Sequence, residues 1–119
     1  MISLKKSNLK IIKRWIKLPY VVSFSWYPPS ASDIVAKRYL ETLQKYPVIS
    51  SIKRLVPAAV TATKEGIEAF VVDEVKRENM GEALDYGAKF LVEFRDIEGF
   101  RYQIRTFSTV TEAMEYIGK

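Results

Sequence analysis

The chain has 119 residues, of which 48% are apolar and 28% are charged, and these values are those of an ordinary globular chain with room for one core. It contains no Cys and no His, which excludes disulfides, thiolate nucleophiles, haem held by His and zinc sites built from these residues. An acid–base step would need a carboxylate, Lys or Tyr with a strongly shifted pKa, so we do not expect robust catalysis.

The positive charge is concentrated in the first part of the chain. The net charge is +5, yet residues 1–32 hold six basic residues and no acid, while the rest holds 13 basic residues against 14 acidic ones. On a helical wheel, residues 4–18 place apolar side chains on one half and basic ones on the other. We predict a basic amphipathic N-terminal arm over residues 1–19, with these candidate surface-contact residues: Lys6, Lys10, Lys13, Arg14, Trp15 and Lys17.

Two interpretations of this arm stay open. It is either a helix packed on the body or on a sister subunit, or a contact with nucleic acid or an anionic membrane surface. No stretch of the sequence reaches the ~20 apolar residues that cross a bilayer. Basic residues also interrupt the segment where a signal peptide would have an apolar block, so we expect a cytoplasmic protein.

The rest of the chain, residues 20–119, alternates between strand-like and helix-like segments. Residues 20–27 are rich in β-branched and aromatic side chains and stop at two prolines, which predicts a strand. A helix is expected next, from N-cap residues at 30–33 to Pro47. Residues 51–62 and 67–75 predict a hairpin, and Pro57 indicates that its first arm is an edge strand or carries a bulge.

The last third of the chain predicts a further helix, a strand and a short helix. Asn79 and Glu82 resemble a capping pair for a helix that runs to a C-cap at Gly99. Residues 100–107 alternate as a strand, and Thr109 with Glu112 forms a capping box for a final helix that ends near Gly118. The order βαββαβ predicts an α+β, ferredoxin-like domain in which two helices cover one face of a four-stranded antiparallel sheet, with the first strand central.

This element order, together with the aromatic-ended first strand Tyr20-Val-Val-Ser-Phe-Ser-Trp26, resembles the dimeric α+β barrel proteins, including the antibiotic-biosynthesis-monooxygenase-like group. The resemblance covers about residues 20–118. It implies a homodimer whose open sheet faces enclose a cavity. For the monooxygenase-like group it also implies a cofactor-independent enzyme, with Trp26, Tyr27 and Arg105 as candidate residues here. The sequence departs from that group because it lacks His and because its two asparagines fall outside the strands.

Alternation along the first strand separates two sets of side chains. Tyr20, Val22, Phe24 and Trp26 form one set, which we expect in a core; Val21, Ser23, Ser25 and Tyr27 form the other. We predict that the second set faces the inter-sheet cavity, together with Arg101, Gln103 and Arg105 of the last strand. Hydroxyls and guanidinium groups bind carboxylates and phosphates, which favours a small ligand and would suit an anionic one. The candidate ligand-binding residues are Ser23, Ser25, Trp26, Tyr27, Gln103 and Arg105, with no cofactor or metal expected.

A protein partner that binds near the same cavity is as open an expectation as a small ligand. A further alternative, binding of nucleic acid, comes from the third predicted strand. Residues 65–72 faintly resemble the RNP1 segment of RNA-recognition motifs, in which strand aromatics stack on bases. Carboxylates give no clear site: Asp73 and Glu74 are neighbours in a strand and point to opposite faces. Glu93 and Asp96 indicate a solvated helix face rather than a metal site.

Overall fold

A computed structural model describes residues 19–117 of the protein. Its elements are β1 (Tyr20–Tyr27), the 3-10 turn η1 (Pro29–Ala31), α2 (Ser32–Lys45), β2 (Ile52–Thr63), β3 (Gly66–Val75), the 3-10 turn η2 (Arg77–Asn79), α3 (Met80–Val92), β4 (Arg101–Phe107) and α4 (Val110–Ile117). The predicted basic helix, and with it Lys6, Lys10, Lys13, Arg14, Trp15 and Lys17, lies outside the described residues.

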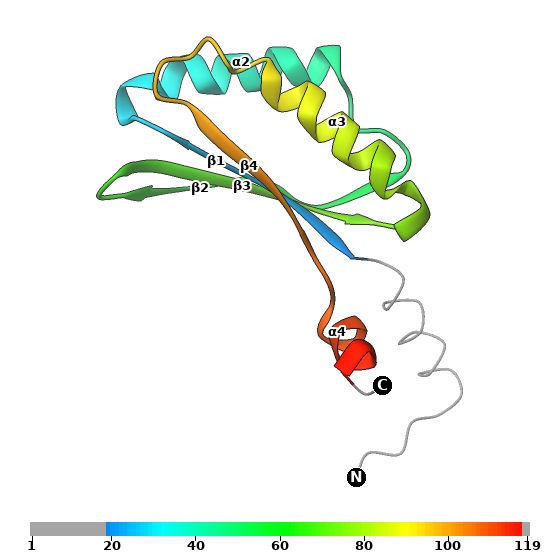
Figure 1. The fold of residues 1–119 in the computed structure, drawn as a ribbon. Coiled ribbons are helices and arrows are strands. Elements are labelled where there is room, and N and C mark those ends of the chain that lie inside the picture. Colours follow the sequence, from blue (N-terminus) through cyan, green and yellow to red (C-terminus); the bar gives the residue numbers. More distant parts are fainter. Residues whose placement is uncertain (1–18, 118–119) are drawn as a thin grey trace.

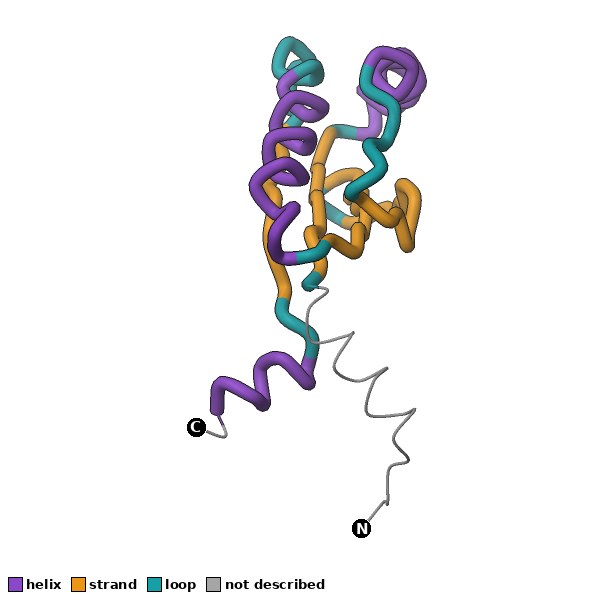
Figure 2. Tube along the Cα trace, turned by 90° about the vertical axis from the view of Figure 1, so that its right-hand side faces the viewer, coloured by secondary structure: helices purple, strands orange, loops and turns teal. Residues whose placement is uncertain are grey.

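The four strands form one antiparallel sheet in the order β2-β3-β1-β4. Helices α2 and α3 both lie over one face of this sheet, and α4 projects beyond the end of β4 (Figures 1 and 2). The predicted α+β architecture with βαββαβ order and a central first strand is therefore confirmed. Within the described residues no helix covers the second face of the sheet, which we call the open face.

The core lies between the sheet and the two helices. It joins Val21 and Tyr27 of β1 to aromatic side chains of α3 and of the loop that follows it. Phe94 and Phe100 stack with ring centroids 4.9 Å apart. Each large apolar side chain buried here stabilises the fold by about 1.5–3 kcal/mol, so the side of β1 that carries Val21 and Tyr27 must face the helices.

The β2–β3 hairpin has the turn and the irregularity that its sequence predicts. Gly66 adopts a φ of +132°, and a Cβ at this position would lie 2.8 Å from the carbonyl oxygen of Tyr27. Two register shifts occur in β2, one between Arg54 and Val56 and one between Val56 and Ala59. Pro57 lies within the second shift, on an edge strand, as expected for a residue without an N–H.

The start and the end of α3 differ from the prediction. The helix ends at Val92, because the chain continues to Ile97 in tighter turns, with N–H groups of Phe94 and Ile97 donating to carbonyls three residues back at 3.1 Å. Phe94 and Ile97 are buried nevertheless. Their spacing in the sequence therefore continues the apolar pattern of the helix beyond its true end. Asn79 occupies the N-cap position without a side-chain hydrogen bond, which corrects the predicted capping pair.

Candidate functional site

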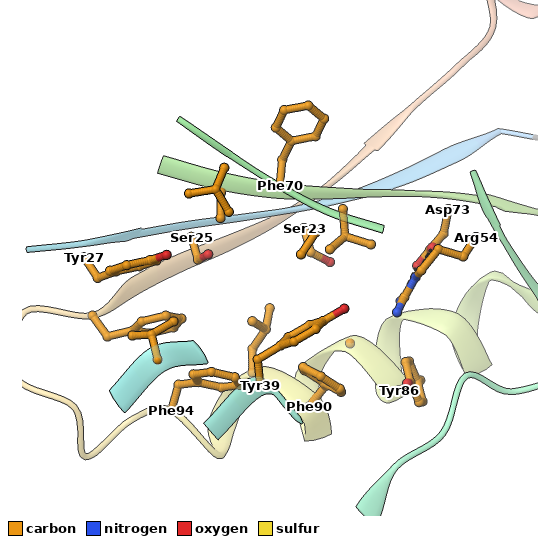
Figure 3. Close-up of a pocket in the computed structure, with 18 of the residues that line it drawn as sticks. Ser23, Ser25, Tyr27, Tyr39, Arg54, Phe70, Asp73, Tyr86, Phe90 and Phe94 are labelled. Carbon is orange, nitrogen blue, oxygen red and sulfur yellow. Dashed lines mark hydrogen bonds and ion pairs between the residues drawn. The ribbon is translucent and has the colours of Figure 1, made fainter. Parts of the chain in front are cut away.

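The two faces of β1 are oriented opposite to the prediction. Ser23, Ser25 and Tyr27 point toward the helices, whereas Phe70 of the neighbouring strand points to the other side of the sheet (Figure 3). Phe24, the register partner of Phe70, shares the open face with it and stacks on Trp26 at 6.0 Å. The physical reason is that Val21 and Tyr27 flank the serines on the same set, and their burial carries the serines to the helix side.

The polar residues of β4 are consequently separated from the serines. Arg101, Gln103 and Arg105 lie opposite Trp26, Phe24 and Val22 in the β1–β4 pairing, and side chains of directly paired residues point to the same face. The six predicted ligand-binding residues therefore divide into two groups: Ser23, Ser25 and Tyr27 under the helices, and Trp26, Gln103 and Arg105 on the open face. The prediction of one shared site was wrong, and the Trp26, Tyr27 and Arg105 arrangement does not form within a subunit.

The serines line a cavity of about 320 Å³ between the sheet and the helices. In the orientation of Figure 1, its floor comes from β1 and the β2–β3 hairpin and its roof from α2 and α3; Figure 3 shows the same cavity with the strands uppermost. Most of the lining is apolar or aromatic, including Val35, Tyr39, Phe90, Leu91, Phe94 and Phe100. The two serines are recognisable as site residues from the sequence, but the roof is not, because apolar helix faces of this kind also pack into closed cores.

The hydroxyl groups around the cavity differ in their partners. Among residues 19–117, the hydroxyl of neither Ser23 nor Ser25 has a hydrogen-bond partner. Tyr86, by contrast, donates to the carbonyl oxygen of Tyr46 at 2.7 Å. Burial raises the pKa of the Tyr27 and Tyr86 hydroxyls, so both stay neutral at ordinary pH. The cavity thus offers unused hydroxyls and no phenolate.

One ion pair forms part of the cavity wall. Arg54 of β2 and Asp73 of β3 are register partners, joined by Nε–Oδ1 and Nη2–Oδ2 hydrogen bonds of 2.9 and 3.1 Å. Their side chains are 17% and 6% exposed. Because each charge neutralises the other, the guanidinium is not free to bind an anion. Glu74 lies on the opposite face from Asp73, as expected for neighbours in a strand.

Two further ion pairs connect α2 to the end of α3 above the cavity. Arg38 contacts Asp96 at 2.6 Å, and Lys45 contacts Glu93 at 2.7 Å. The hydrogen bonds from Arg38 and Lys45 lower the pKa of Asp96 and of Glu93, respectively. These acids hold the roof together. Within residues 19–117, no group of three acidic side chains could hold a metal ion, and no helix is long and apolar enough to cross a membrane.

No family model matches the chain, and no curated protein matches it either. Two solved structures match parts of this chain. One is the de novo designed protein Foldit4, with 13% identity and a TM-score of 0.49 over 77% of this chain and 97% of that one. The other is a candidate PII-like signaling protein from Thermus thermophilus, with 10% identity and a TM-score of 0.35 over 82% of this chain and 94% of that one.

Proposed function

We propose that the protein binds a small, mostly apolar molecule in the cavity between its sheet and its helices. The observation that carries this proposal is the pair of hydroxyls, Ser23 and Ser25, that face an otherwise apolar space without a protein partner. Both serines are half-buried, and neither hydroxyl is a fully buried atom without a partner, so a ligand that displaces water from them must replace the hydrogen bonds that the water makes. A ligand with a hydroxyl or carbonyl group would supply the missing partner, which is the usual design of a small-molecule site.

The charge and size of the cavity narrow the ligand class. Because Arg54 is already paired with Asp73, the ligand is neutral rather than the anion that the sequence favoured. A cavity of about 150 Å³ accepts benzene, so a space of about 320 Å³ suits a molecule with two fused rings. The ligand class is therefore a neutral aromatic or alicyclic compound with one polar group.

Binding of naphthalene and of 1-naphthol, which differ by one hydroxyl, tests this proposal. Calorimetry on the purified protein is expected to show a preference for 1-naphthol of about 2- to 10-fold, the equivalent of one net hydrogen bond. Replacing both serines (Ser23→Ala and Ser25→Ala) should remove the preference but keep naphthalene binding. Ser25→Leu should narrow the space and weaken binding of both compounds, while the exposed Ser50→Ala serves as the matched control. The proposal fails if the wild-type protein binds neither compound.

We further propose that two subunits associate through their open faces. Phe24, Trp26 and Phe70 are only partly buried there, and a contiguous apolar patch of this kind marks an interaction surface. Glu68 and Arg101 lie on either side of Trp26 at the same level of the sheet. Neither forms an ion pair within the described residues.

The charge pattern favours a second copy of the chain as the partner. A two-fold axis running along β1 places β4 of one subunit above β3 of the other and leaves the level along the strands unchanged. Arg101 would then face Glu68 of the partner subunit, and the symmetry repeats the contact, as in an isologous interface.

The remaining alternatives have less support. In the segment that resembles RNP1, Ile67 and Ala69 pack toward the core, so the positions expected to stack on bases are not available. Nucleic-acid or membrane binding through the basic arm depends on residues 1–18 and stays a prediction. We do not propose an oxygenase, since Trp26 and Tyr27 lie on opposite faces of the sheet.

A further inference from the structure

Helix α4 presents an apolar stripe on its outer side. Val110, Met114 and Ile117 are 77%, 65% and 83% exposed, and their spacing of four and three residues places them on one side of the helix. The opposite side is fixed to the body: Glu112 is 1% exposed and pairs with Arg77, with an Nε–Oε2 distance of 2.7 Å. The stripe is therefore held in a defined orientation, and three adjacent exposed apolar side chains on a short helix indicate a contact surface.

The chain enters the fold directly beside this helix. Tyr20, the first residue of β1, is the register partner of Phe107, the last residue of β4, three residues before α4 begins. Pro19 lines one pocket together with Ser108 and Glu112. Residues 1–18 are thus tethered next to the N-terminal end of α4. An 18-residue helix would be about 27 Å long against about 12 Å for α4, so the segment is long enough to reach the whole stripe.

The chemistry of the two segments is complementary. Residues 1–18 carry an apolar half, with Ile12 and Trp15 near its centre, and six basic residues without an acid. Helix α4 carries the exposed Glu115 and no basic residue between Val110 and Ile117, while Glu112 is already paired with Arg77. A basic amphipathic segment is stabilised by an apolar dock with acids nearby, since its own like charges repel.

We propose that residues 1–18 dock by their apolar half on the Val110, Met114 and Ile117 stripe of α4 in the same chain. The occupant is this segment rather than a second copy of α4, because the tether gives it a high local concentration and because its charge is opposite. Docking leaves the lysines on the outer side. The proposal does not depend on the ligand cavity, which lies under α2 and α3.

Paired cysteines test the contact cleanly, because the natural chain has none. In a glutathione redox buffer, Ile12→Cys with Met114→Cys is expected to close an intramolecular disulfide with at least a ten-fold higher effective concentration than Lys10→Cys with Met114→Cys. Lys10 lies only two residues from Ile12 in the sequence but on the basic half of the segment. The length of chain that links each cysteine to the fold is therefore nearly the same in the two variants. Equal closure of the two pairs would overturn the proposal, and so would a disulfide that links two chains, since a second copy would then cover the stripe.

Fluorescence of Trp15 gives an independent measurement without cysteines. In a Trp26→Phe background Trp15 is the sole tryptophan, and docking predicts a blue-shifted emission protected from acrylamide. Adding Met114→Asp and Ile117→Asp should shift the emission to the red and raise quenching at least two-fold, with unchanged far-UV circular dichroism. The matched control Leu84→Asp changes an exposed apolar residue of α3 and should leave Trp15 unaffected. An emission typical of exposed tryptophan before the aspartates are added would refute docking.

Discussion

Arg54 and Asp73 face each other across the β2–β3 pairing and form a two-point ion pair in the wall of the cavity. The pair sits beside apolar side chains, where the loss of one partner leaves the other charge partly buried and uncompensated. This relationship determines both the neutrality of the cavity and the stability of the edge strand.

Asp73→Ala is expected to lower the free energy of unfolding by roughly 3 kcal/mol, because it leaves the Arg54 guanidinium partly buried without a counter-charge. Replacing both residues with apolar ones (Arg54→Met with Asp73→Leu) should recover most of this loss. Urea denaturation of the three proteins measures the effect. Glu74→Ala, on the open face, serves as control with a change within about 0.5 kcal/mol. A loss in the double variant as large as in Asp73→Ala would show that the pair itself, rather than the stranded charge, stabilises the fold.

Charge reversal tests the proposed subunit contact. Arg101→Glu should place two acids opposite each other at both symmetric contacts and shift sedimentation toward the monomer, weakening association at least ten-fold. Combining it with Glu68→Arg should restore the dimer. The exposed Arg95→Glu, which lies in the loop after α3, controls for net charge. Wild-type protein that sediments as a monomer at micromolar concentration would rule out the interface.

Acid should weaken the connection between α2 and the loop after α3. The hydrogen bond from Arg38 lowers the pKa of Asp96 below its ordinary value of 3.8, so the carboxylate form stabilises the folded state. That contribution is complete above about pH 4 and is lost as the pH falls through the lowered pKa. Asp96→Asn should therefore be less stable than wild type at pH 7, with the difference in urea midpoint shrinking toward zero as the pH falls below the lowered pKa of Asp96.

High salt provides a check on the same pair. Because the side chain of Asp96 is largely exposed, 1 M NaCl should also reduce the difference between wild type and Asp96→Asn at pH 7. A difference that is constant with both pH and salt would assign the effect of the substitution to something other than the ion pair.

Two glycines allow a matched comparison of backbone strain. Gly66→Ala is expected to cost about 1–3 kcal/mol, because φ is +132° and the added Cβ would meet the carbonyl oxygen of Tyr27. Gly81→Ala, in the first turn of α3, meets nothing within 4 Å and should be neutral or stabilise by up to about 1 kcal/mol. Thermal unfolding of both variants gives the comparison. A Gly66→Ala protein as stable as wild type would mean that the hairpin turn relaxes freely.

Much of the fold could be predicted because its signals are local. Prolines and glycines end the elements, and apolar periodicity distinguishes strands from helices; both are properties of neighbouring residues. These signals predicted the βαββαβ order, the central position of β1 and the edge position of the strand that contains Pro57. They also indicated Ser23 and Ser25 as candidate site residues, because hydroxyl groups in the middle of a strand need hydrogen-bond partners when they are buried.

The tertiary structure alone decided which face of β1 meets the helices. Alternation separates Phe24 and Trp26 from Val21 and Tyr27, but both sets are apolar enough for a core, so the choice depends on packing against α2 and α3. The Arg54–Asp73 pair likewise depends on the two register shifts in β2, whose size no local pattern fixes. The sequence determined the elements because they follow from short-range chemistry, whereas the cavity and its ion pair arise from contacts between segments distant along the chain.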